Sequence, residues 1–259
     1  MIVTVLGSGT SAGVPMIGCA CPVCRSSDAR NRRTRASIWV EHRGRHFVVD
    51  TTPDFRAQVL REGVPRVDGV LWTHAHADHI NGIDDLRAFN FLQRDAIQGW
   101  ANPETAAYLK RAFAYIWATD VQVGGGKPAL DLRAIPDDPS AFRPYDLPIV
   151  PLPVKHGRLD VTGYRFGPFA YITDTNHIPD ETLARLEGLD VLILSALRPE
   201  PHPTHFNFAE SIEIVRRVRP GRAYFTHLNH EVDHAREGAD LPDGITLAFD
   251  GLKIELPDA

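Results

Sequence analysis

Short apolar runs alternate along the chain with segments whose apolar residues recur at helical spacing. The runs IVTVL (2–6), SIWV (37–40), FVVD (47–50) and GVLW (69–72) are rich in Val and Ile and are bounded by Gly, Asp or charged residues, which predicts strands. The same pattern predicts strands in six later runs: YRFG (164–167), AYIT (170–173), VLILS (191–195), AYFT (223–226), TLAF (246–249) and LKIEL (252–256).

Four segments have the start and stop signals of helices: 53–63, 102–117, 179–188 and 207–218. In the first, Thr52 is a candidate N-cap, Pro53 suits the first helical position and Gly63 suits the end. The second opens with the similar sequence Asn-Pro-Glu. In the last, Asn207 and Glu210 have the spacing of a capping box.

The segment from about Val123 to Pro153 is rich in Gly, Pro and Asp, which predicts loops and an edge hairpin. No internal repeat is visible, and strands mix with helices throughout. This mixture favours an α/β layered fold, although it does not give the strand order. The length is compatible with one domain over residues 1–259.

Composition and charge narrow the class of protein. The chain is 43% hydrophobic and 24% charged, as in ordinary globular proteins, and its net charge of −5 argues against general binding to nucleic acid. No apolar stretch approaches the ~20 residues that cross a bilayer, and the N-terminus lacks the features of a signal peptide. Three cysteines within six positions make a poor disulfide framework. We therefore expect a cytoplasmic protein with reduced thiols and no membrane partner.

The strongest chemical signal is the sequence HAHADH, which directly follows the apolar run ending at Trp72. It places His74, His76, Asp78 and His79 within six residues. A loop that leaves a strand can direct several such side chains into one space. Imidazole mixed with carboxylate suits divalent zinc, manganese or iron. The motif therefore predicts a metal site.

Three further ligand-type residues each follow an apolar run, as if they met at one edge of the sheets. They are His156 after PLPVK, Asp174 after AYIT and His227 after AYFT. With the four residues of the motif they make seven candidate ligands. Two four-coordinate metals need eight bonds, and one bridging carboxylate would supply two of them.

The only cysteines, Cys19, Cys21 and Cys24, form a second cluster that predicts either a zinc site or a group of reactive thiols. With twelve histidines in the chain, counting alone does not identify a fourth ligand. Five arginines follow this knuckle and are equally consistent with phosphate binding or a solvated charged face: Arg25, Arg30, Arg32, Arg33 and Arg35.

Two other segments have structural explanations that we prefer. The sequence GSGTSAG (7–13) is not a Walker A loop, and a tight turn between strands explains it better than phosphate binding. Asp84 and Asp85, which follow the metal motif, could hydrogen-bond a metal-bound histidine. Favourable charge at the start of a helix is the simpler reading.

The H-x-H-x-D-H motif with distant His, Asp and His at strand ends resembles the metallo-β-lactamase superfamily of binuclear hydrolases. The resemblance implies an αββα sandwich with two metals at one edge. It also implies one metal on His74, His76 and His156, a second on Asp78, His79 and His227, and Asp174 as the bridge. Two such divalent ions, zinc or manganese, would generate a bridging hydroxide and polarise the substrate, so metal-assisted hydrolysis is the expected reaction.

The knuckle, the segment HPTHFNFAES and the segment THLNHEVDH together resemble the PhnP-like branch of that superfamily, the phosphoribosyl cyclic phosphodiesterases. The resemblance runs over essentially the whole chain. It implies that His230 completes a structural zinc site with the three cysteines, with His234 as the alternative. It also implies that His205 lies beside the metals and assists cleavage together with the ligands Asp78 and Asp174, with His202 as a rival. A small cyclic or nucleotide-like phosphodiester is the expected substrate.

Two segments, GTSAGVPMIG and GIDDLRAFN, depart from the phosphoribosyl enzymes, so other functions on the same metal core compete with this one. The enzyme could open a lactone or a thioester. An oxygen-handling protein would carry a glutamate in the motif where this chain has His76, which favours hydrolysis. A ribonuclease acting on transfer RNA would need a basic, glycine-rich arm, and GGGKPALDLR (124–133) is short for one. A homodimer is the default expectation for the assembly.

Overall fold

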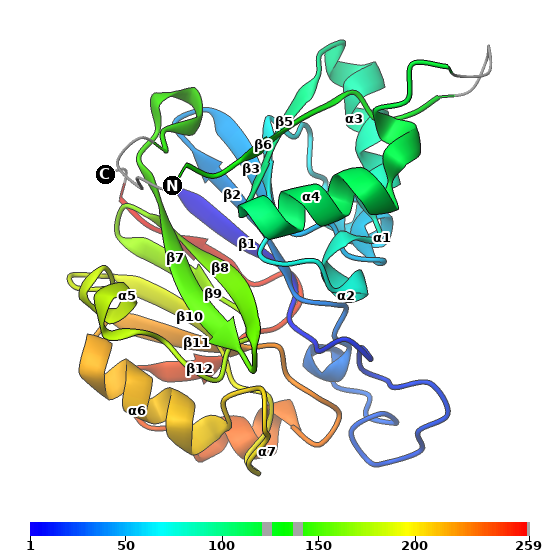
Figure 1. The fold of residues 1–259 in the computed structure, drawn as a ribbon. Helices are drawn as coiled ribbons and strands as arrows, with labels where there is room; N and C mark the ends of the chain where they lie inside the picture. Colours follow the sequence, from blue (N-terminus) through cyan, green and yellow to red (C-terminus); the bar gives the residue numbers. More distant parts are fainter. Residues whose placement is uncertain (121–125, 137–141, 258–259) are drawn as a thin grey trace.

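Two mixed β-sheets pack face to face with helices on both outer faces (Figure 1). The computed structural model describes residues 1–120, 126–136 and 142–257. In spatial order, the first sheet contains β13 (Lys253–Glu255), β1 (Ile2–Gly7), β2 (Ser37–His42), β3 (Arg45–Val49), β4 (Gly69–Leu71), β5 (Ile97–Ala101) and β6 (Leu130–Ala134). The second contains β12 (Ile245–Leu247), β11 (Arg222–Thr226), β10 (Val191–Ser195), β9 (Phe169–Ile172), β8 (Leu159–Phe166) and β7 (Ile149–His156).

Each sheet combines an antiparallel part with a parallel part. In the first, β13, β1, β2 and β3 are antiparallel neighbours, whereas β3, β4, β5 and β6 run parallel. In the second, β12, β11, β10 and β9 run parallel, and β9, β8 and β7 are antiparallel. Parallel strands end at the same edge of a sheet, so the loops that leave them can share one site.

The alternation of side chains along the strands divides the core into layers. Ile38 and Val40 on β2 contact the core between the sheets, which also contains Phe166 of β8. Trp39, between them in sequence, packs on the opposite face with Phe55 of the helical layer. Successive side chains of a strand point to opposite faces of the sheet, so a strand that is buried on both faces contributes to two core layers. The expected αββα arrangement is therefore observed.

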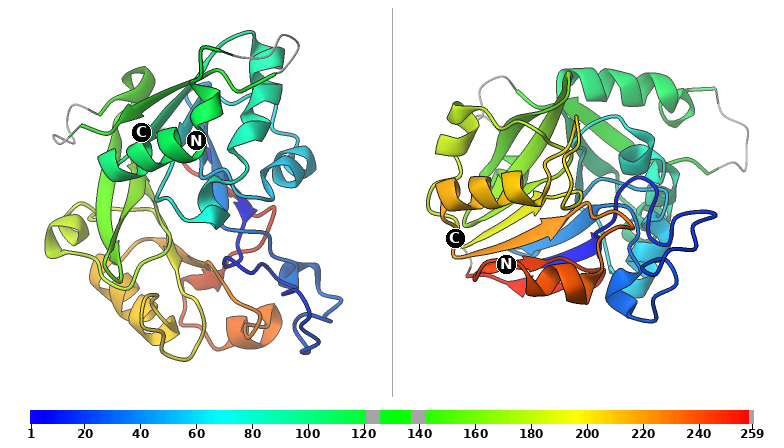
Figure 2. Two further views of the ribbon diagram at one scale, coloured as in Figure 1. Left: turned by 45° about the vertical axis from the view of Figure 1, so that its right-hand side comes forward. Right: turned by 90° about the horizontal axis from the view of Figure 1, so that it is seen from below.

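Helices cover the outer face of each sheet (Figure 2). Beside the first sheet lie α1 (Phe55–Glu62), α2 (Ala77–Ile80), α3 (Leu86–Gln93) and α4 (Pro103–Ala112), and beside the second lie α5 (Asp180–Ala184), α6 (Phe208–Val218) and α7 (His234–Ala239). In the part of the chain that the structure describes, four short 3-10 turns connect elements: η1 (Ala29–Asn31), η2 (Ile83–Asp85), η3 (Ala114–Ile116) and η5 (Pro144–Asp146). Within the described residues, every helix is too short or too polar to cross a bilayer.

Several predicted helix ends are observed, but three are wrong: α4 ends at Ala112 rather than Trp117, α5 ends at Ala184 rather than Gly188, and the start of α1 also differs. The capping box of Asn207 and Glu210 opens α6, with both hydrogen bonds at 2.9 Å. Helix α1 ends at Gly63 as expected, but it begins at Phe55 rather than at Pro53. The Thr52 hydroxyl accepts the Asp54 N–H at 3.1 Å, as a capping threonine does, and donates to the side chain of the buried Gln58 at 3.0 Å.

The predicted hairpin between about Val123 and Pro153 is wrong for the residues that the structure describes there. Residues 123–125 and 137–141 of that segment lie outside the description. Strand β6 instead pairs in parallel with β5, and β7 forms the far edge of the second sheet against β8. Proline and glycine obscured β6 and the start of β7 in the sequence, whereas the end of β7 at His156 was expected from the run PLPVK. Helix α3 and strand β5 were also not expected from the sequence.

Candidate metal centre

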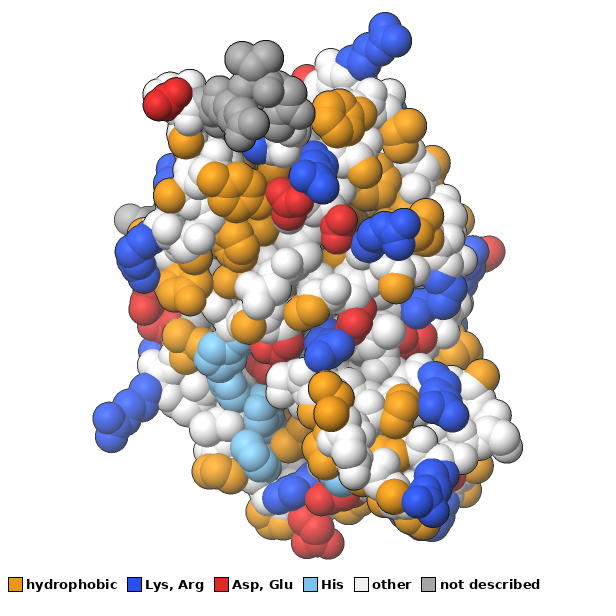
Figure 3. Space-filling view, turned by 90° about the vertical axis from the view of Figure 1, so that its right-hand side faces the viewer, with side chains coloured by type: hydrophobic (Ala, Val, Ile, Leu, Met, Phe, Trp, Pro, Cys, Tyr) orange, Lys and Arg blue, Asp and Glu red, His pale blue; other side chains and the backbone are white. Residues whose placement is uncertain are grey.

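The candidate site lies where strands of both sheets end. Strand β4 leads through Trp72 into the HAHADH loop, and β7 ends at His156. Strand β9 ends two residues before Asp174, and β11 ends immediately before His227. Histidine side chains gather in a column on this face of the molecule (Figure 3). The sheets are joined here by the hydroxyl of Tyr164, which donates to the carbonyl of Trp72 at 2.7 Å.

Asp174 lies at the centre of the cluster with a different histidine at each carboxylate oxygen. Its Oδ2 is 3.2 Å from His79 Nε2, and its Oδ1 is 3.2 Å from His227 Nε2. Asp78 Oδ2 also lies 3.2 Å from His79 Nε2. Two ligands bound at ~2.0 Å to one tetrahedral ion lie about 3.3 Å apart, so these separations suit ligands that share an ion.

Candidate ligand atoms lie within 4.8 Å of one another in three overlapping sets: His74, His79 and Asp174; Asp78, His79 and His227; and His156, Asp174 and His205. The second set is the trio expected for one metal. The other two differ from the expected grouping, because His205 joins a set and His76 joins none. His76 nevertheless borders the cluster, with its ring 4.6 Å from that of His74 and 5.3 Å from that of His156.

Hydrogen bonds fix the tautomers of three of these histidines. His79 Nδ1 lies 2.7 Å from a carboxylate oxygen of Asp50, and His156 Nδ1 lies 2.7 Å from the carbonyl oxygen of Thr204. Because both oxygens only accept, each Nδ1 carries the proton. Thr73 donates its hydroxyl to Asp50 and thus accepts from His74 Nδ1 at 2.9 Å. Each Nε2 is therefore left as a lone pair.

These lone pairs show whether the residues of the cluster could hold a metal ion. His74 Nε2 and His79 Nε2 are buried and have no hydrogen-bond partner among the described residues, and neither has His205 Nδ1. Buried polar atoms are normally satisfied. The Nε2 of His79 faces two carboxylates, Asp78 and Asp174, so a positive charge is needed between them, either a proton on the ring or a metal cation that replaces it. Imidazole and carboxylate donors in this arrangement fit divalent zinc or manganese.

Asp50 is the functional residue that the sequence reasoning missed. Its carboxylate is fully buried and accepts from the Thr73 N–H and the Thr73 hydroxyl, both at 2.8 Å, besides His79. A carboxylate behind a ligating histidine orients the ring and raises its basicity. The available signal was the aspartate that ends the run FVVD. Asp84, considered for this role, instead accepts from the hydroxyl of Tyr115 at 2.8 Å, away from the histidines.

The electrostatics of the cluster follow from its burial and from its neighbouring charges. Burial raises the pKa of Asp50, although His79 partly offsets this. Burial also opposes ionisation of Asp174, but the neighbouring imidazoles of His227 and His79 outweigh it and hold the pKa of that carboxyl well below its usual value. For His205, burial and then repulsion from His227 lower the pKa to about 3, so its ring is neutral in the free protein and would take up a proton only beside the negative charge of a bound phosphodiester.

Three residues of the site adopt the left-handed backbone region that non-glycine residues rarely occupy. The φ angles are 66° at Asp50, 49° at Asp174 and 60° at His227. Such conformations cost of order 1–3 kcal/mol each and concentrate at functional sites. Each residue lies just after a strand, where the sharp backbone turn directs its side chain into the cluster.

His205 and His202 lie next to each other in the loop before α6. The His205 ring is 4.4 Å from that of His156 and 5.0 Å from that of His227, and its Nδ1 is 3.8 Å from Asp174 Oδ1. The His202 ring is 5.1 Å from that of His205 and is more exposed. His202 Nδ1 accepts from the Thr204 N–H at 3.3 Å. His205 therefore contacts the candidate ligands directly, whereas His202 contacts His205 and lies further from the ligands.

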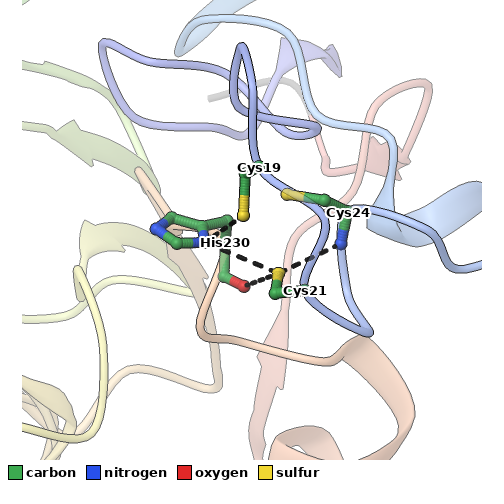
Figure 4. A group of neighbouring side chains, drawn as sticks. All are labelled: Cys19, Cys21, Cys24 and His230. Atoms are coloured by element: carbon green, nitrogen blue, oxygen red, sulfur yellow. Dashed lines mark hydrogen bonds between the residues drawn. The ribbon is translucent and has the colours of Figure 1, made fainter.

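The three cysteines form a second cluster with His230, which lies far from them in the sequence (Figure 4). Cys19 Sγ and Cys21 Sγ lie 3.5 and 3.6 Å from His230 Nδ1, and Cys24 completes the group. A tetrahedral zinc with Zn–S of ~2.3 Å and Zn–N of ~2.0 Å separates sulfur from nitrogen by about 3.6 Å. The side chains thus fit a closed Cys3His site. His234, the alternative, lies outside this set.

The loop that carries the knuckle is tied to the loop that carries His227 and His230. The guanidinium of Arg33 is buried, with 2% of the residue exposed, and donates to the carbonyls of Asn229 at 3.2 Å and Val232 at 2.8 Å. It also donates to the side chain of Asn31 at 2.9 Å. The knuckle and its arginine therefore hold the loop that follows β11 in place.

The arginines after the knuckle do not form one common surface. Arg33 is neither solvated nor available to phosphate, because it is buried against backbone carbonyls. Arg30 pairs with Asp28 at 2.7 Å, and Arg35 pairs with Asp54 at 3.0 Å. The glycine-rich turn is structural as well, since Gly9 bridges to Arg35 and to the segment next to His227.

Comparison with known proteins places this fold and site in a family. Residues 45–228 match the family described as Beta-lactamase superfamily domain. A crystal structure described as a new diphosphatase from the PhnP family has a TM-score of 0.91 at 43% identity, over 99% of this chain and 98% of that one.

Two sequence relatives are longer proteins. An octanoyltransferase of Porphyromonas gingivalis is 35% identical over 96% of this chain and 50% of its own length. A ribonuclease Z of a Bradyrhizobium strain is 28% identical over 69% of this chain and 53% of its own length. The chain thus spans about half the length of each. The family match and the full-length structural match agree with the resemblance in the sequence: the chain belongs to the β-lactamase superfamily and has the metallo-β-lactamase fold of its PhnP-like branch.

Proposed function

We propose that the chain is a binuclear metal-dependent phosphodiesterase that acts on a cyclic or nucleotide-like phosphodiester. The observation that carries the proposal is the position of Asp174. Its carboxylate lies within 4.8 Å of ligand atoms of His74 and His156, which are expected for one ion, and 3.2 Å from His79 and His227, which are expected for the other. A carboxylate in that position suits a bridge between two ions. The ribonuclease Z similar to this chain supports a phosphodiester as the substrate, and the similar diphosphatase supports hydrolysis at phosphorus more broadly.

The proposed ligands are the seven residues expected from the sequence: His74, His76, Asp78, His79, His156, Asp174 and His227. When bound, two divalent zinc or manganese ions would lower the pKa of a bound water and neutralise charge on the phosphoryl oxygens. The protein's part is to keep each imidazole neutral and oriented. Asp50, Thr73 and the Thr204 carbonyl do this by holding the Nδ1 protons on the side away from the cluster.

His205 is proposed as the group that assists the leaving alkoxide, by donating a proton or by holding a phosphoryl oxygen. Its support is its position among His156, His227 and Asp174. His202 lies further from the carboxylates and accepts a backbone hydrogen bond. We assign it no catalytic role.

Cys19, Cys21, Cys24 and His230 are proposed to hold one structural zinc. The sulfur-to-nitrogen separations of 3.5 and 3.6 Å support a closed tetrahedral site. Its role would be to fasten the N-terminal loop to the loop after β11. A single domain, a homodimer and a cytoplasmic location remain predictions from the sequence.

The test is turnover by the metal-loaded protein. It should hydrolyse bis(p-nitrophenyl) phosphate and 2′,3′-cyclic AMP, and Asp174→Asn should abolish both activities while the protein remains folded by circular dichroism. Turnover of a lactone or a thioester, with no phosphodiester cleaved, would retain the fold and refute the substrate class. Oxygen uptake after anaerobic loading with ferrous iron would instead support the redox alternative.

A further inference from the structure

A hollow of about 420 Å³ opens directly beside His76, on the side of the candidate metal centre that faces α4. Ala75, Leu159 and one face of α4 line it. Ligand sites of small molecules range from about 300 to 1,000 Å³, so this volume suits part of a substrate. Because His76 borders both, a substrate held at the metal centre would extend into this space.

The α4 face toward the hollow is chemically distinct from the rest of the helix. Glu104, Tyr108 and Arg111 follow one another at spacings of four and three residues, so they share one face. All three are exposed, whereas Ala106 and Leu109 of the same helix pack into the core against the first sheet. This face is therefore not needed for packing.

Tyr108 and Arg111 form a stacked pair within this hollow. The Arg111 guanidinium carbon lies 5.1 Å from the centroid of the Tyr108 ring, and 39% of the tyrosine is exposed. Among the described residues, neither Arg111 nor Glu104 forms an ion pair with another side chain. An aromatic ring and a planar guanidinium are the two groups on which a flat ring stacks most favourably.

The charges of the hollow indicate what kind of group it accepts. One acid, Glu104, and one base, Arg111, make its lining neutral overall, which disfavours a further phosphate. A neutral, planar group with its own donors and acceptors matches better, because Glu104 can accept from an amino group while Arg111 donates. A nucleobase has all of these properties.

We propose that this hollow is the base subsite of the enzyme, with Tyr108 and Arg111 as its stacking surface and Glu104 as a polar contact. The inference rests on the proposed phosphodiesterase function and specifies its substrate class: a phosphodiester that carries a nucleobase. The subsite would contribute to substrate binding and selectivity. It would have no part in bond cleavage.

The test compares a base-bearing with a base-free substrate. Wild-type, metal-loaded protein should prefer 2′,3′-cyclic AMP to glycerol 1,2-cyclic phosphate in kcat/KM. Tyr108→Ala should reduce this preference about tenfold, mainly through KM. The free energy of stacking one base on an aromatic side chain corresponds to a change in affinity of roughly that size. Tyr108→Phe should restore it. Tyr115→Ala is the matched control, since Tyr115 is 44% exposed, near the end of the same helical segment, and does not line the hollow.

A binding measurement separates this proposal from the function itself. Equilibrium dialysis of the metal-loaded protein should show tighter binding of AMP than of ribose 5-phosphate, and Tyr108→Ala should remove the difference. If neither cyclic phosphodiester were hydrolysed, the proposed function would fail, and dialysis would still decide the subsite. Unchanged selectivity and unchanged AMP binding in Tyr108→Ala would overturn the base subsite alone.

Discussion

The imidazole of His79 and the carboxylate of Asp50 form a fully buried pair, with Nδ1 2.7 Å from Oδ2. The pair turns the Nε2 lone pair of His79 toward Asp78 and Asp174. An isolated arrangement of this kind would be unfavourable. It becomes favourable when a positive charge lies between the ring and the carboxylates, either a proton on Nε2 or a metal cation that replaces it.

Asp50→Asn should therefore weaken metal binding and activity together. An amide in place of the carboxylate keeps the size of the side chain, but makes His79 a poorer donor to the metal. Loss of such a partner typically costs 10- to 100-fold, so we expect a decrease of about that size in kcat/KM and in metal affinity measured by competition with a chelator. Asp84→Asn is the control, because Asp84 binds Tyr115 on the surface. Wild-type affinity in Asp50→Asn would show that the pair has no such role.

The contrast between Asp50 and the predicted ligands shows what the sequence could reveal. The HAHADH loop is recognisable because several ligand types are adjacent, and His156, Asp174 and His227 are recognisable because each ends an apolar run. Asp50 also ends such a run, but no other metal-ligating residue lies beside it in the sequence to indicate a role in the site. Its role depends on the parallel pairing of β3 with β4, which places Asp50 beside the Thr73 backbone.

Other features were not predicted from the sequence because they also depend on tertiary contacts. Strand β6 pairs with β5 across a segment rich in glycine and proline, and local pattern does not give the partner of a strand. Arg33 resembled its exposed neighbours, and only the position of the loop after β11 shows that it is buried. The fold class followed from the alternation of strands and helices together with the family resemblance. Residue burial depended on tertiary contacts.

His230→Ala should release one zinc per chain and lower the melting temperature. The remaining three thiols cannot close a tetrahedral site, and the clasp between the N-terminal loop and the loop after β11 would loosen. Metal analysis by mass spectrometry and thermal unfolding measure both effects. His234→Ala should keep its zinc, because His234 lies outside the cysteine cluster. The reverse pattern in the two variants would assign the fourth ligand to His234.

Arg33→Ala should destabilise the protein without changing phosphate binding. It removes donors to two backbone carbonyls and to the side chain of Asn31, and each unsatisfied buried group costs about 1–3 kcal/mol. We expect a loss of about 3 kcal/mol in the free energy of unfolding by urea. Arg30→Ala, which breaks an exposed pair with Asp28, should cost less than about 1 kcal/mol. A raised KM at wild-type stability in Arg33→Ala would instead indicate contact with the substrate.

His205→Ala should slow the hydrolysis of a substrate more strongly when its leaving group is more basic. An alkoxide leaving from 2′,3′-cyclic AMP needs a proton, whereas p-nitrophenolate leaves readily without one. Loss of a general acid therefore predicts a decrease in kcat of about 100-fold or more with the cyclic nucleotide and a much smaller decrease with bis(p-nitrophenyl) phosphate. His202→Ala should show no such difference between substrates. Equal decreases with both substrates, accompanied by loss of metal, would identify His205 as a ligand.

Anomalous scattering from crystals of the metal-loaded protein tests the binuclear centre most directly. Data collected at the zinc and manganese absorption edges should show two peaks beside Asp174, one toward His74 and His156 and one toward His79 and His227, and a third peak enclosed by Cys19, Cys21, Cys24 and His230. A single peak beside Asp174, or none, would contradict the binuclear centre on which the proposed phosphodiesterase depends.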